Sequence, residues 1–251
     1  DVYKRQNHTY FMDKNIYLSI IIPAHNEANR LPNTLERTLS FLKQQNYTSE
    51  VLIIENGSQD DTFRIAQHAS QDLSNSQVTI TAIHEEQKGK GRAVQRGMLA
   101  ARGAYRFMAD ADLSMPIEEV SLFLPPLLEN YDVAIGSREA RGAVRFNEPL
   151  YRHWGGRFIN LLIRWLALPG LRDTQCGFKC FTAPTAEHLF SLQTQMGWAF
   201  DVEILFLARK FHYKIVEVPI HWYFNPESKL NLFRDTIQMM RDIYTIRKNS
   251  M

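Results

Sequence analysis

Two acidic side chains one residue apart are the strongest chemical signal in the chain. Asp110 and Asp112 directly follow the apolar run Tyr105–Ala109. Two carboxylates at the end of a strand can bind one hard cation such as Mg²⁺ or Mn²⁺, and a diphosphate can supply further oxygen ligands. Taken alone, such a pair is more often a set of helix-capping or turn acids, here ahead of Pro116. The neighbouring loops decide between these two interpretations.

A basic loop containing glycines precedes the acidic pair. Lys88, Lys90 and Arg92 alternate with two glycines just before a segment with helical character. Glycine-rich backbone and positive charge at the start of a helix suit a phosphate group, which makes Lys90 a candidate phosphate contact. The loop has neither the P-loop spacing nor the dinucleotide G-x-G-x-x-G pattern. A solvated basic loop is therefore an equally good interpretation.

Polar residues also follow the first two apolar runs of the chain. Pro23, Asn26 and Glu27 come at and after the end of the first run, and Asn56 comes after the second. In an open α/β sheet the ligand lies outside the carboxyl ends of the strands. We therefore expect these side chains to gather with the acidic pair where a nucleotide would lie.

Five short apolar runs predict the strands that position these loops. Most are rich in β-branched residues and end in turns, as buried parallel strands do. The expected strands are Tyr17–Pro23, Glu50–Ile54, Val78–Ile83, Tyr105–Ala109 and Asp132–Ile135, and the expected helices are Leu31–Gln45, Asp60–Ser70, Gly91–Arg102 and Pro116–Glu129. This alternation predicts an α/β fold with a single doubly wound, mostly parallel sheet in the first half of the chain.

The alternation of strand and helix stops after the fifth strand. We expect helices over Tyr151–Ala167, Gly197–Phe211 and Leu232–Ile246, and a strand over Lys214–Trp222. With 251 residues, of which 45% are hydrophobic, the chain can bury the core of one sizeable domain. We see no linker or internal repeat, so we expect the second half to form a lid on the first within one structural domain.

Charge and cysteine content exclude several functional classes. Lys and Arg number 29 and Asp and Glu 27, a balance without the positive field that non-specific nucleic-acid binding needs, so we expect no nucleic-acid partner. Cys176 and Cys180 stand alone, which is too few ligands for a structural zinc site. We expect two reduced thiols, as in a cytosolic chain. The oligomeric state stays open.

The sequence predicts peripheral rather than integral membrane contact. It contains no run of roughly 18 apolar residues, and residues 1–16 have the character of an extension without the apolar run of a secretory signal. Near the end, apolar residues recur at helical spacing beside basic ones: Phe233, Ile237, Met240 and Tyr244, with Arg234, Arg241, Arg247 and Lys248. Such a helix suits the anionic, cytoplasmic face of a membrane, or packs on its own domain.

Taken in order, the motifs resemble family 2 glycosyltransferases. The segments are IIPAHNE, ENGSQDDT, KGKGRAVQRGML, MADADLSMP and AIGSRE. Further segments, DTQCGFKCF, GWAFDVEIL, EVPIHW and ESKL, are similar to dolichyl-phosphate glucosyltransferases and their polyprenyl-phosphate relatives. The resemblance covers Ser19 to about Leu232 and is specific as a set, although each motif alone is not.

The resemblance implies a GT-A fold whose residues 17–140 bind a nucleotide-sugar and whose residues 141–251 bind the acceptor. It implies that the base and ribose pocket is lined by Pro23, Asn26, Glu27 and Asn56, with Lys90, Asp110 and Asp112 at the phosphates. Asp110 and Asp112 would also hold Mg²⁺ or Mn²⁺. Relatives usually have Asp where Asn56 stands, which weakens a uridine assignment, although an amide oxygen can still accept from uracil. A Gly is commoner at Glu227.

The implied reaction is inverting transfer of a hexose, glucose from UDP-glucose foremost, to a polyprenyl or dolichyl phosphate. Arg138, Ser228 and Lys229 are the candidate acceptor contacts, and Asp112, Asp173 and Arg138 the candidate catalytic residues. A phosphate nucleophile is already anionic at neutral pH and needs positioning more than a base. A hydroxyl acceptor would instead require a carboxylate to take its proton. Trp198 and Asp201 could contact sugar, but a buried aromatic with a capping acid is the simpler interpretation.

Four alternatives remain open at this stage. One is a transferase to a glycan hydroxyl in surface-polysaccharide synthesis. A second is a mannosyltransferase using GDP-mannose, because the DADLS segment also resembles dolichyl-phosphate mannose synthases. A third is a non-catalytic subunit that binds nucleotide-sugar. Such a subunit would be free to lose the acidic pair, whereas this chain keeps both carboxylates. A nucleotidyltransferase is disfavoured because no phosphate-binding loop typical of that chemistry follows the first strand.

Overall fold

A seven-stranded, mostly parallel sheet forms the centre of the protein. The computed structural model describes residues 16–149, 163, 167–225 and 232–249. The strand order is β3-β2-β1-β4-β7-β5-β8, and β7 alone in this sheet runs antiparallel to its neighbours. The strands are β1 Leu18–Ala24, β2 Ser49–Asn56, β3 Val78–Glu85, β4 Tyr105–Met108, β5 Val133–Ser137, β7 Lys179–Thr182 and β8 Ile215–Pro219. The predicted α/β fold is thus confirmed.

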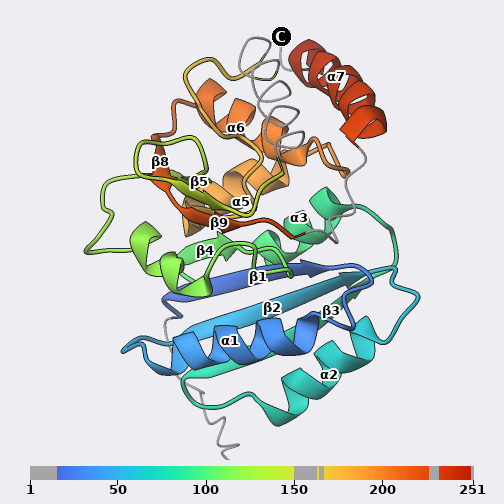
Figure 1. Ribbon diagram of the computed structural model, residues 1–251, viewed down its shortest axis with the longest axis vertical. Coiled ribbons are helices and arrows are strands. Elements are labelled where there is room, and N and C mark those ends of the chain that lie inside the picture. The colour runs from blue at the N-terminus through green and yellow to red at the C-terminus, as the bar shows by residue number, and fades with distance from the viewer. Residues whose placement is uncertain (1–15, 150–162, 164–166, 226–231, 250–251) are drawn as a thin grey trace, which may run out of the picture.

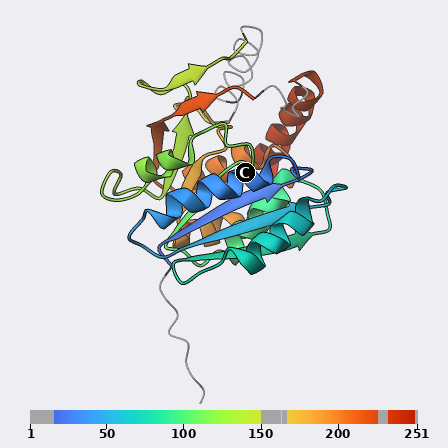
Figure 2. The ribbon, with the colours of Figure 1, turned by 60° about the horizontal axis from the view of Figure 1, so that its bottom comes forward.

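Helices cover both faces of this sheet (Figure 1). On one face lie α1 Leu31–Lys43, α2 Thr62–Asp72 and the short 3₁₀ helix η1 Ile117–Phe123, and on the other lie α3 Lys90–Ala100, α5 Ala183–Ser191, α6 Phe200–Lys210 and α7 Leu232–Asn249. A two-stranded parallel ribbon pairs β6 Val144–Phe146 with β9 His221–Tyr223. In Figure 2 this ribbon, yellow-green and orange-red, stands apart from the main sheet.

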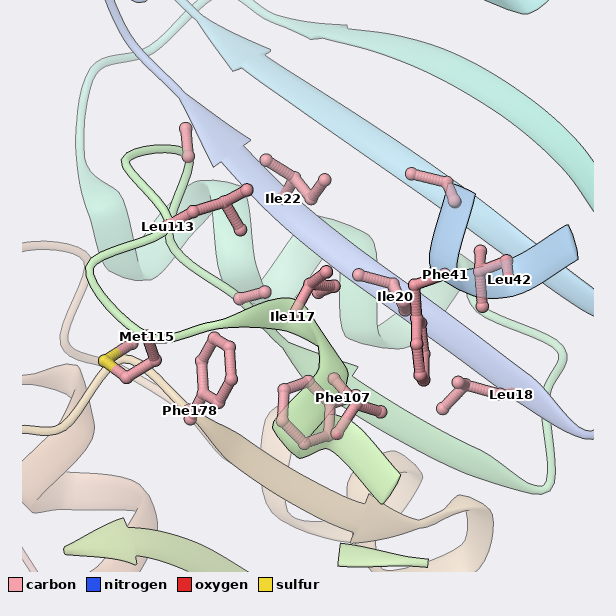
Figure 3. Packing of buried hydrophobic residues seen from close by; sticks show 14 of the residues in the cluster. Leu18, Ile20, Ile22, Phe41, Leu42, Phe107, Leu113, Met115, Ile117 and Phe178 are labelled. Carbon is pink, nitrogen blue, oxygen red and sulfur yellow. The ribbon is translucent and has the colours of Figure 1, made fainter. Parts of the chain in front are cut away.

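The period of the strands explains why the sheet has two cores. Successive side chains of a strand point to opposite faces. In β1, Ile20 and Ile22 pack with α1 and the 3₁₀ helix, whereas Ile21 packs against α3 on the other face. Figure 3 shows the first cluster, in which Phe107 and Phe178 meet edge to face with ring centroids 5.0 Å apart. A strand buried on both faces reads as an unbroken apolar run, which is why the sequence predicts these strands well.

The second half of the chain contributes to the sheet itself, which the sequence did not predict. Strand β7 lies between β4 and β5 and pairs with both. The part of the chain expected to form a lid therefore also supplies strands to the sheet. β7 has only four residues and contains Lys179. Such a short run with a charged residue gives little strand signal.

Three expected elements differ from the structure, and proline explains two. The helix expected over Pro116–Glu129 is reduced to the 3₁₀ turn because Leu124, which precedes Pro125, is extended. The strand expected over Lys214–Trp222 is divided between β8 and β9, which belong to different sheets, at Pro219. The third element that differs is helix α6, which begins at Phe200 rather than at Gly197. Most of the helix expected over Tyr151–Ala167, and residues 1–15 of the extension, lie outside the described residues.

Candidate active site

The acidic pair lies at the carboxyl end of the central strand β4. Asp110 and Asp112 follow Met108, the last residue of that strand, after one further residue, Ala109. The backbone N–H of Ser114 donates to Oδ1 of Asp112 at 3.0 Å, which fixes this carboxylate. Burial, followed by the charge of Asp110, raises the pKa of Asp112. The two carboxylates are therefore close enough to repel each other, as at a site built for positive charge.

A glycine from the second half of the chain leaves the space that Asp110 occupies. A Cβ atom on Gly177 would lie 2.5 Å from Cγ of Asp110, closer than any real contact of that kind. Gly177 stands in the turn before β7, so the inserted strand positions the acidic pair. A larger residue there would push the Asp110 carboxylate away.

Lys90 makes direct contact with the acidic pair. Its Nζ lies 2.6 Å from Oδ1 of Asp110, and its ammonium group lies 5.2 Å from the ring centroid of Trp198. Burial acts to lower the pKa of Lys90, but the charges of Asp110, Asp201 and Asp112 outweigh it and the net pKa is raised. Lys90 is therefore a fully charged ammonium at neutral pH. Trp198 is 42% exposed, contrary to the expectation of a buried aromatic.

The glycines of the basic loop serve packing rather than phosphate binding. The backbone N–H groups of Gly91 and Arg92 donate to the carbonyls of Gly197 and Met196, each at 3.2 Å. A Cβ on Gly91 would lie 2.7 Å from Cβ of Phe200. The start of α3 thus docks against the turn before α6, and these two N–H groups are not open to a phosphate. The expectation that backbone N–H groups of this loop bind a phosphate is therefore wrong for Gly91 and Arg92. The residue of the loop that contacts the acidic pair is Lys90.

Two loops at the ends of β1 and β2 are fastened together. The N–H of Asn26 donates to Ser58 Oγ at 3.0 Å, and the N–H of Gln59 donates to Asn26 Oδ1 at 2.8 Å. Glu27 accepts two hydrogen bonds from the guanidinium of Arg30, at 2.6 and 2.8 Å. The sequence places these residues in the nucleotide pocket, and the structure gives both of them partners within the loops.

Asn56 and Pro23 complete the end of the sheet nearest these loops. Pro23 is paired with Ile54 in the β1–β2 register. Nδ2 of Asn56 donates to the carbonyl of Gly89 at 3.1 Å, and the residue is only 4% exposed. Since a carbonyl can only accept, the amide must present its nitrogen to Gly89, and its Oδ1 remains as an acceptor. That oxygen is the atom that a uracil N3–H would require.

Arg138 and Asp173 form a two-point ion pair between the end of β5 and the loop before β7. Nε and Nη2 of Arg138 donate to the two carboxylate oxygens of Asp173 at 2.6 and 2.9 Å, and the backbone N–H of Arg138 adds a third bond at 3.0 Å. Burial would raise the pKa of Asp173, but Arg138 outweighs it and holds the pKa well below its usual range. Asp173 is therefore a permanent carboxylate and a poor proton acceptor.

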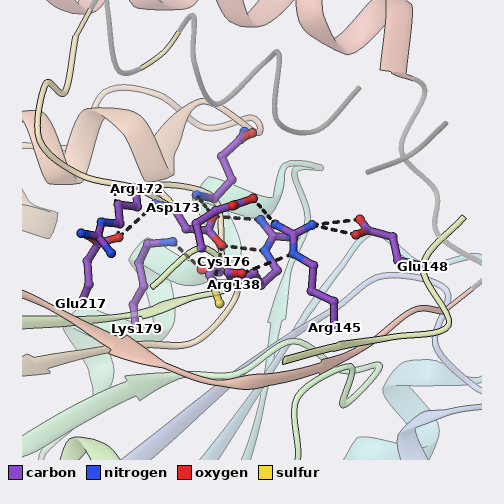
Figure 4. A network of polar contacts seen from close by, with 10 residues as sticks. Arg138, Arg145, Glu148, Arg172, Asp173, Cys176, Lys179 and Glu217 are labelled. Atoms are coloured by element: carbon purple, nitrogen blue, oxygen red, sulfur yellow. Dashed lines mark hydrogen bonds and ion pairs between the residues drawn. The ribbon is translucent and has the colours of Figure 1, made fainter. Parts of the chain in front are cut away.

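Further polar residues surround this ion pair (Figure 4). Oε1 of Glu217 accepts from the backbone N–H groups of Arg172 and Asp173, which anchors the loop that carries the aspartate. Arg145 reaches the carbonyl of Arg138 at 3.3 Å while its guanidinium pairs with Glu139 and Glu148. The charge of Arg145 is thus already neutralised by two carboxylates.

Sequence reasoning missed a buried ion pair between Lys179 and Asp201. Nζ of Lys179 lies 2.6 Å from Oδ1 of Asp201 and donates to the carbonyl of Cys176, also at 2.6 Å. Lys179 is 1% and Asp201 is 4% exposed. Burial, partly offset by Lys179 and Lys90, raises the pKa of Asp201. A lysine inside an apolar strand was the available signal, since buried lysines are almost always paired.

Ser228 and Lys229 lie outside the described residues. Cys176 and Cys180 are free thiols in the interior, and burial raises the pKa of each to about 12. In the described part of the chain, no helix is long and apolar enough to cross a membrane. Within the same residues, no group of three or more His, Cys, Asp or Glu side chains could hold a metal ion.

Comparison with known families decides the class of the site. The model of the glycosyl transferase family 2 matches residues 19–184, which span the acidic pair, Lys90 and the Arg138–Asp173 pair. The chain belongs to family 2 of the glycosyltransferases. This enzyme class accounts for polar loops at the carboxyl ends of β1, β2 and β4.

Individual relatives of this glycosyltransferase extend the likeness beyond the family model. Dolichyl-phosphate beta-glucosyltransferase of Dictyostelium discoideum is 35% identical over 250 residues, covering 93% of this chain and 74% of the relative. The Drosophila melanogaster enzyme of the same name is 38% identical, with 91% and 74% covered. The Homo sapiens enzyme of that name is 33% identical, with 92% and 74% covered.

Solved structures show the same fold in distant glycosyltransferases. Glucosyl-3-phosphoglycerate synthase from Mycobacterium tuberculosis, in complex with UDP, superposes with a TM-score of 0.66 at 16% identity and covers 92% of this chain and 80% of that chain. The same synthase with Mn²⁺, UDP-glucose and phosphoglyceric acid gives 0.65 at 16% identity, with 92% and 79% covered. The predicted GT-A fold is confirmed by this likeness.

Proposed function

We propose that this glycosyltransferase moves glucose from UDP-glucose to a dolichyl or polyprenyl phosphate, with inversion at the anomeric carbon. The supporting comparison is identity to dolichyl-phosphate beta-glucosyltransferases over more than nine-tenths of the chain, including the half that would bind the acceptor. The supporting geometry is the Arg138–Asp173 ion pair. Both point to a phosphate rather than a hydroxyl as nucleophile.

The state of Asp173 favours the phosphate acceptor. A hydroxyl acceptor needs a carboxylate with a pKa near the working pH to take its proton. Burial would raise the pKa of Asp173, but its contacts with Arg138 outweigh burial and lower it. Burial raises the pKa of Asp201, but this carboxylate is only 4% exposed and lies 2.6 Å from Nζ of Lys179, so it is closed to an acceptor hydroxyl. Neither carboxylate suits a general base. A lipid phosphate, with a second pKa of about 6, is already anionic at neutral pH.

The acidic pair fits a divalent cation. Asp110 and Asp112 offer carboxylate oxygens, the ligands that Mg²⁺ and Mn²⁺ prefer, and Gly177 keeps the space around Asp110 open. We propose that these two residues hold the ion together with the diphosphate of the donor. When bound, the ion would stabilise the negative charge that develops on the departing diphosphate.

The residues of the chain would then act mainly by positioning. Because its amide nitrogen is bound to the Gly89 carbonyl, Asn56 would accept from the base through its amide oxygen, and Lys90 would add positive charge beside the diphosphate. Nη1 of Arg138 has no hydrogen-bond partner among the described residues, and the side chain is 21% exposed, so it can donate to the acceptor phosphate. The phosphate oxygen attacks the anomeric carbon as the bond to the diphosphate breaks. No proton has to be removed.

The two halves of the chain would share this work. Residues 17–140 supply most of the donor site and residues 141–251 most of the acceptor site. The division is not strict, because Gly177 and Trp198 of the second half lie against Asp110 and Lys90. We propose one structural domain on this basis, joined by the β4–β7 pairing.

We further propose that the enzyme works at the cytoplasmic face of a membrane through helix α7. Ile243 and Ile246 of this helix are buried in the domain, whereas Tyr244 is 73% exposed. Arg241 and Lys248 are exposed and fall three residues before and four after Tyr244, so all three share one helical face. A basic face with one aromatic suits anionic lipid headgroups.

Flotation with anionic liposomes tests this contact. The fraction of protein that floats with the liposomes should fall with added salt, and association that resists salt would contradict the proposal.

A donor screen tests the proposed reaction. Each nucleotide-sugar is supplied with a polyprenyl phosphate, and release of nucleoside diphosphate is measured. UDP-glucose should give the highest turnover, EDTA should abolish it, and Mg²⁺ or Mn²⁺ should restore it. GDP-mannose as the preferred donor, or full activity in metal-free buffer, would contradict the proposal.

A further inference from the structure

The ammonium group of Lys90 contacts a carboxylate oxygen of Asp110 that a metal ion would need as a ligand. Nζ of Lys90 lies 2.6 Å from Oδ1 of Asp110, and the two side chains are 18% and 28% exposed. A partly buried pair at this distance is an interaction that solvent screens only weakly. The positive charge beside the acidic pair in this structure therefore comes from the protein itself.

The surroundings of Lys90 hold it in place without a donor. The ammonium group lies over the ring of Trp198, 5.2 Å from the centroid, a geometry that attracts a cation. The charges of Asp112 and Asp201 act on it as well. Asp201 is already paired with Lys179, so Asp110 is the direct partner of Lys90.

A second cation at Asp110 would have to displace this ammonium group. Two positive charges in contact with the same carboxylate repel each other. Moving Lys90 into water would lose its favourable interactions with Asp110 and Trp198. The exchange becomes favourable when a new anion receives the ammonium group. A nucleoside diphosphate beside Asp110 provides that anion, and the flexible four-carbon stem of lysine allows the short move.

We propose that Lys90 and a divalent cation exclude each other at Asp110, so that the cation binds only together with a nucleoside diphosphate, which takes over the Lys90 ammonium group. The inference rests on the proposed donor chemistry and adds an order of binding to it. The acidic pair alone supplies only two carboxylate ligands, which agrees with a site completed by the nucleotide. Lys90 is thus a positioning residue that keeps Asp110 in place until the donor arrives.

Binding of Mn²⁺ alone to the full chain, followed by electron paramagnetic resonance, tests the exclusion. Wild-type protein should bind Mn²⁺ weakly, and Lys90→Met should bind it at least tenfold more tightly because the competing charge is gone. Lys88→Met removes a nearby exposed lysine of the same loop and should behave as wild type. Lys90→Arg keeps the charge and should also stay weak. Asp110→Asn in the Lys90→Met background should abolish the gain.

Addition of UDP should tighten binding of Mn²⁺ more in wild type than in Lys90→Met. Wild-type protein should then bind Mn²⁺ at least tenfold more tightly than without UDP, whereas Lys90→Met should gain less because no ammonium group meets the diphosphate. The fluorescence of Trp198 provides a readout in the unaltered protein. It should change with Mg²⁺ and UDP together but not with Mg²⁺ alone, and Trp198→Phe should remove the change.

The outcomes separate this inference from the proposed function. If UDP and Mn²⁺ bind together but Lys90→Met takes up Mn²⁺ alone no more tightly than wild type, the exclusion is overturned and the donor site stands. Tight binding of Mn²⁺ alone by wild type overturns it equally. If no variant binds Mn²⁺ with UDP present, the proposed donor site fails as well.

Discussion

The guanidinium of Arg138 grips both carboxylate oxygens of Asp173, at 2.6 and 2.9 Å, and Asp173 is completely buried. Arg138 also lies over the ring of Trp222, 5.6 Å from the centroid. These two contacts hold the side chain in one orientation, and Nη1 has no hydrogen-bond partner among the described residues. The pair joins the end of β5 to the loop before β7, so it supports the fold and holds Arg138 where we propose that the acceptor phosphate binds.

Asp173→Asn should destabilise the protein strongly. The substitution leaves the Arg138 charge without its buried partner, and breaking a buried ion pair in this way costs roughly 3–5 kcal/mol. Urea unfolding followed by circular dichroism measures the loss. Glu85→Gln, a carboxylate change outside this ion pair, serves as the control and should alter stability by less than about 0.5 kcal/mol. A loss below about 1 kcal/mol for Asp173→Asn would show that Arg138 does not depend on this partner.

The same ion pair should make stability depend on acidity. Burial alone would raise the pKa of Asp173, but its contacts with Arg138 outweigh this effect, so the pKa is lowered in the folded protein. A group with a depressed folded pKa stabilises the fold above its unfolded value, about 3.9, and loses that contribution as pH falls toward the folded pKa. The stability difference between wild type and Asp173→Asn should therefore be constant from pH 7 to 5 and shrink below pH 4. A difference that stays constant down to pH 2 would contradict this account.

Gly177→Ala should weaken binding of the donor through Asp110. The added Cβ would lie 2.5 Å from Cγ of Asp110 and would displace the carboxylate. We expect the affinity for UDP with Mn²⁺, measured by calorimetry, to fall at least tenfold, or about 1.4 kcal/mol. Gly197→Ala is the matched control, because a Cβ at Gly197 would have no neighbouring atom within 4 Å. Equal affinities for the two variants would remove Gly177 from the donor site.

The sequence predicts the first half of the fold well because its first three strands are long and keep a regular pattern of apolar residues. β1 and β2 are buried along almost their whole length, whereas β3 alternates buried apolar residues with exposed ones in its first half. The predicted limits of all three strands differ from the observed ones by at most two residues. The position of Asp110 after β4 follows from the same pattern. Local periodicity is sufficient where a strand is long and its neighbours in the sheet come next in the chain.

The remainder depends on contacts between distant residues. Strand β7 takes its place in the sheet from pairing with β4 and β5, which its own four residues do not encode. The partner of Lys179 is Asp201, 22 positions away, and the space that Asp110 needs is created by Gly177. Likewise, Arg138 lies 35 positions before Asp173, whose pKa it lowers. Such relationships appear only when the chain is folded.

The choice of acceptor tests the central claim most directly. Purified protein is given radiolabelled UDP-glucose and Mn²⁺ with dolichyl phosphate, with dolichol, or with a free glycan, and lipid-soluble and glycan-bound label are counted at several pH values. We predict transfer to dolichyl phosphate only, without the loss of activity near neutral pH that an essential protein base would cause. Efficient transfer to dolichol or to the glycan, and none to dolichyl phosphate, would contradict the account.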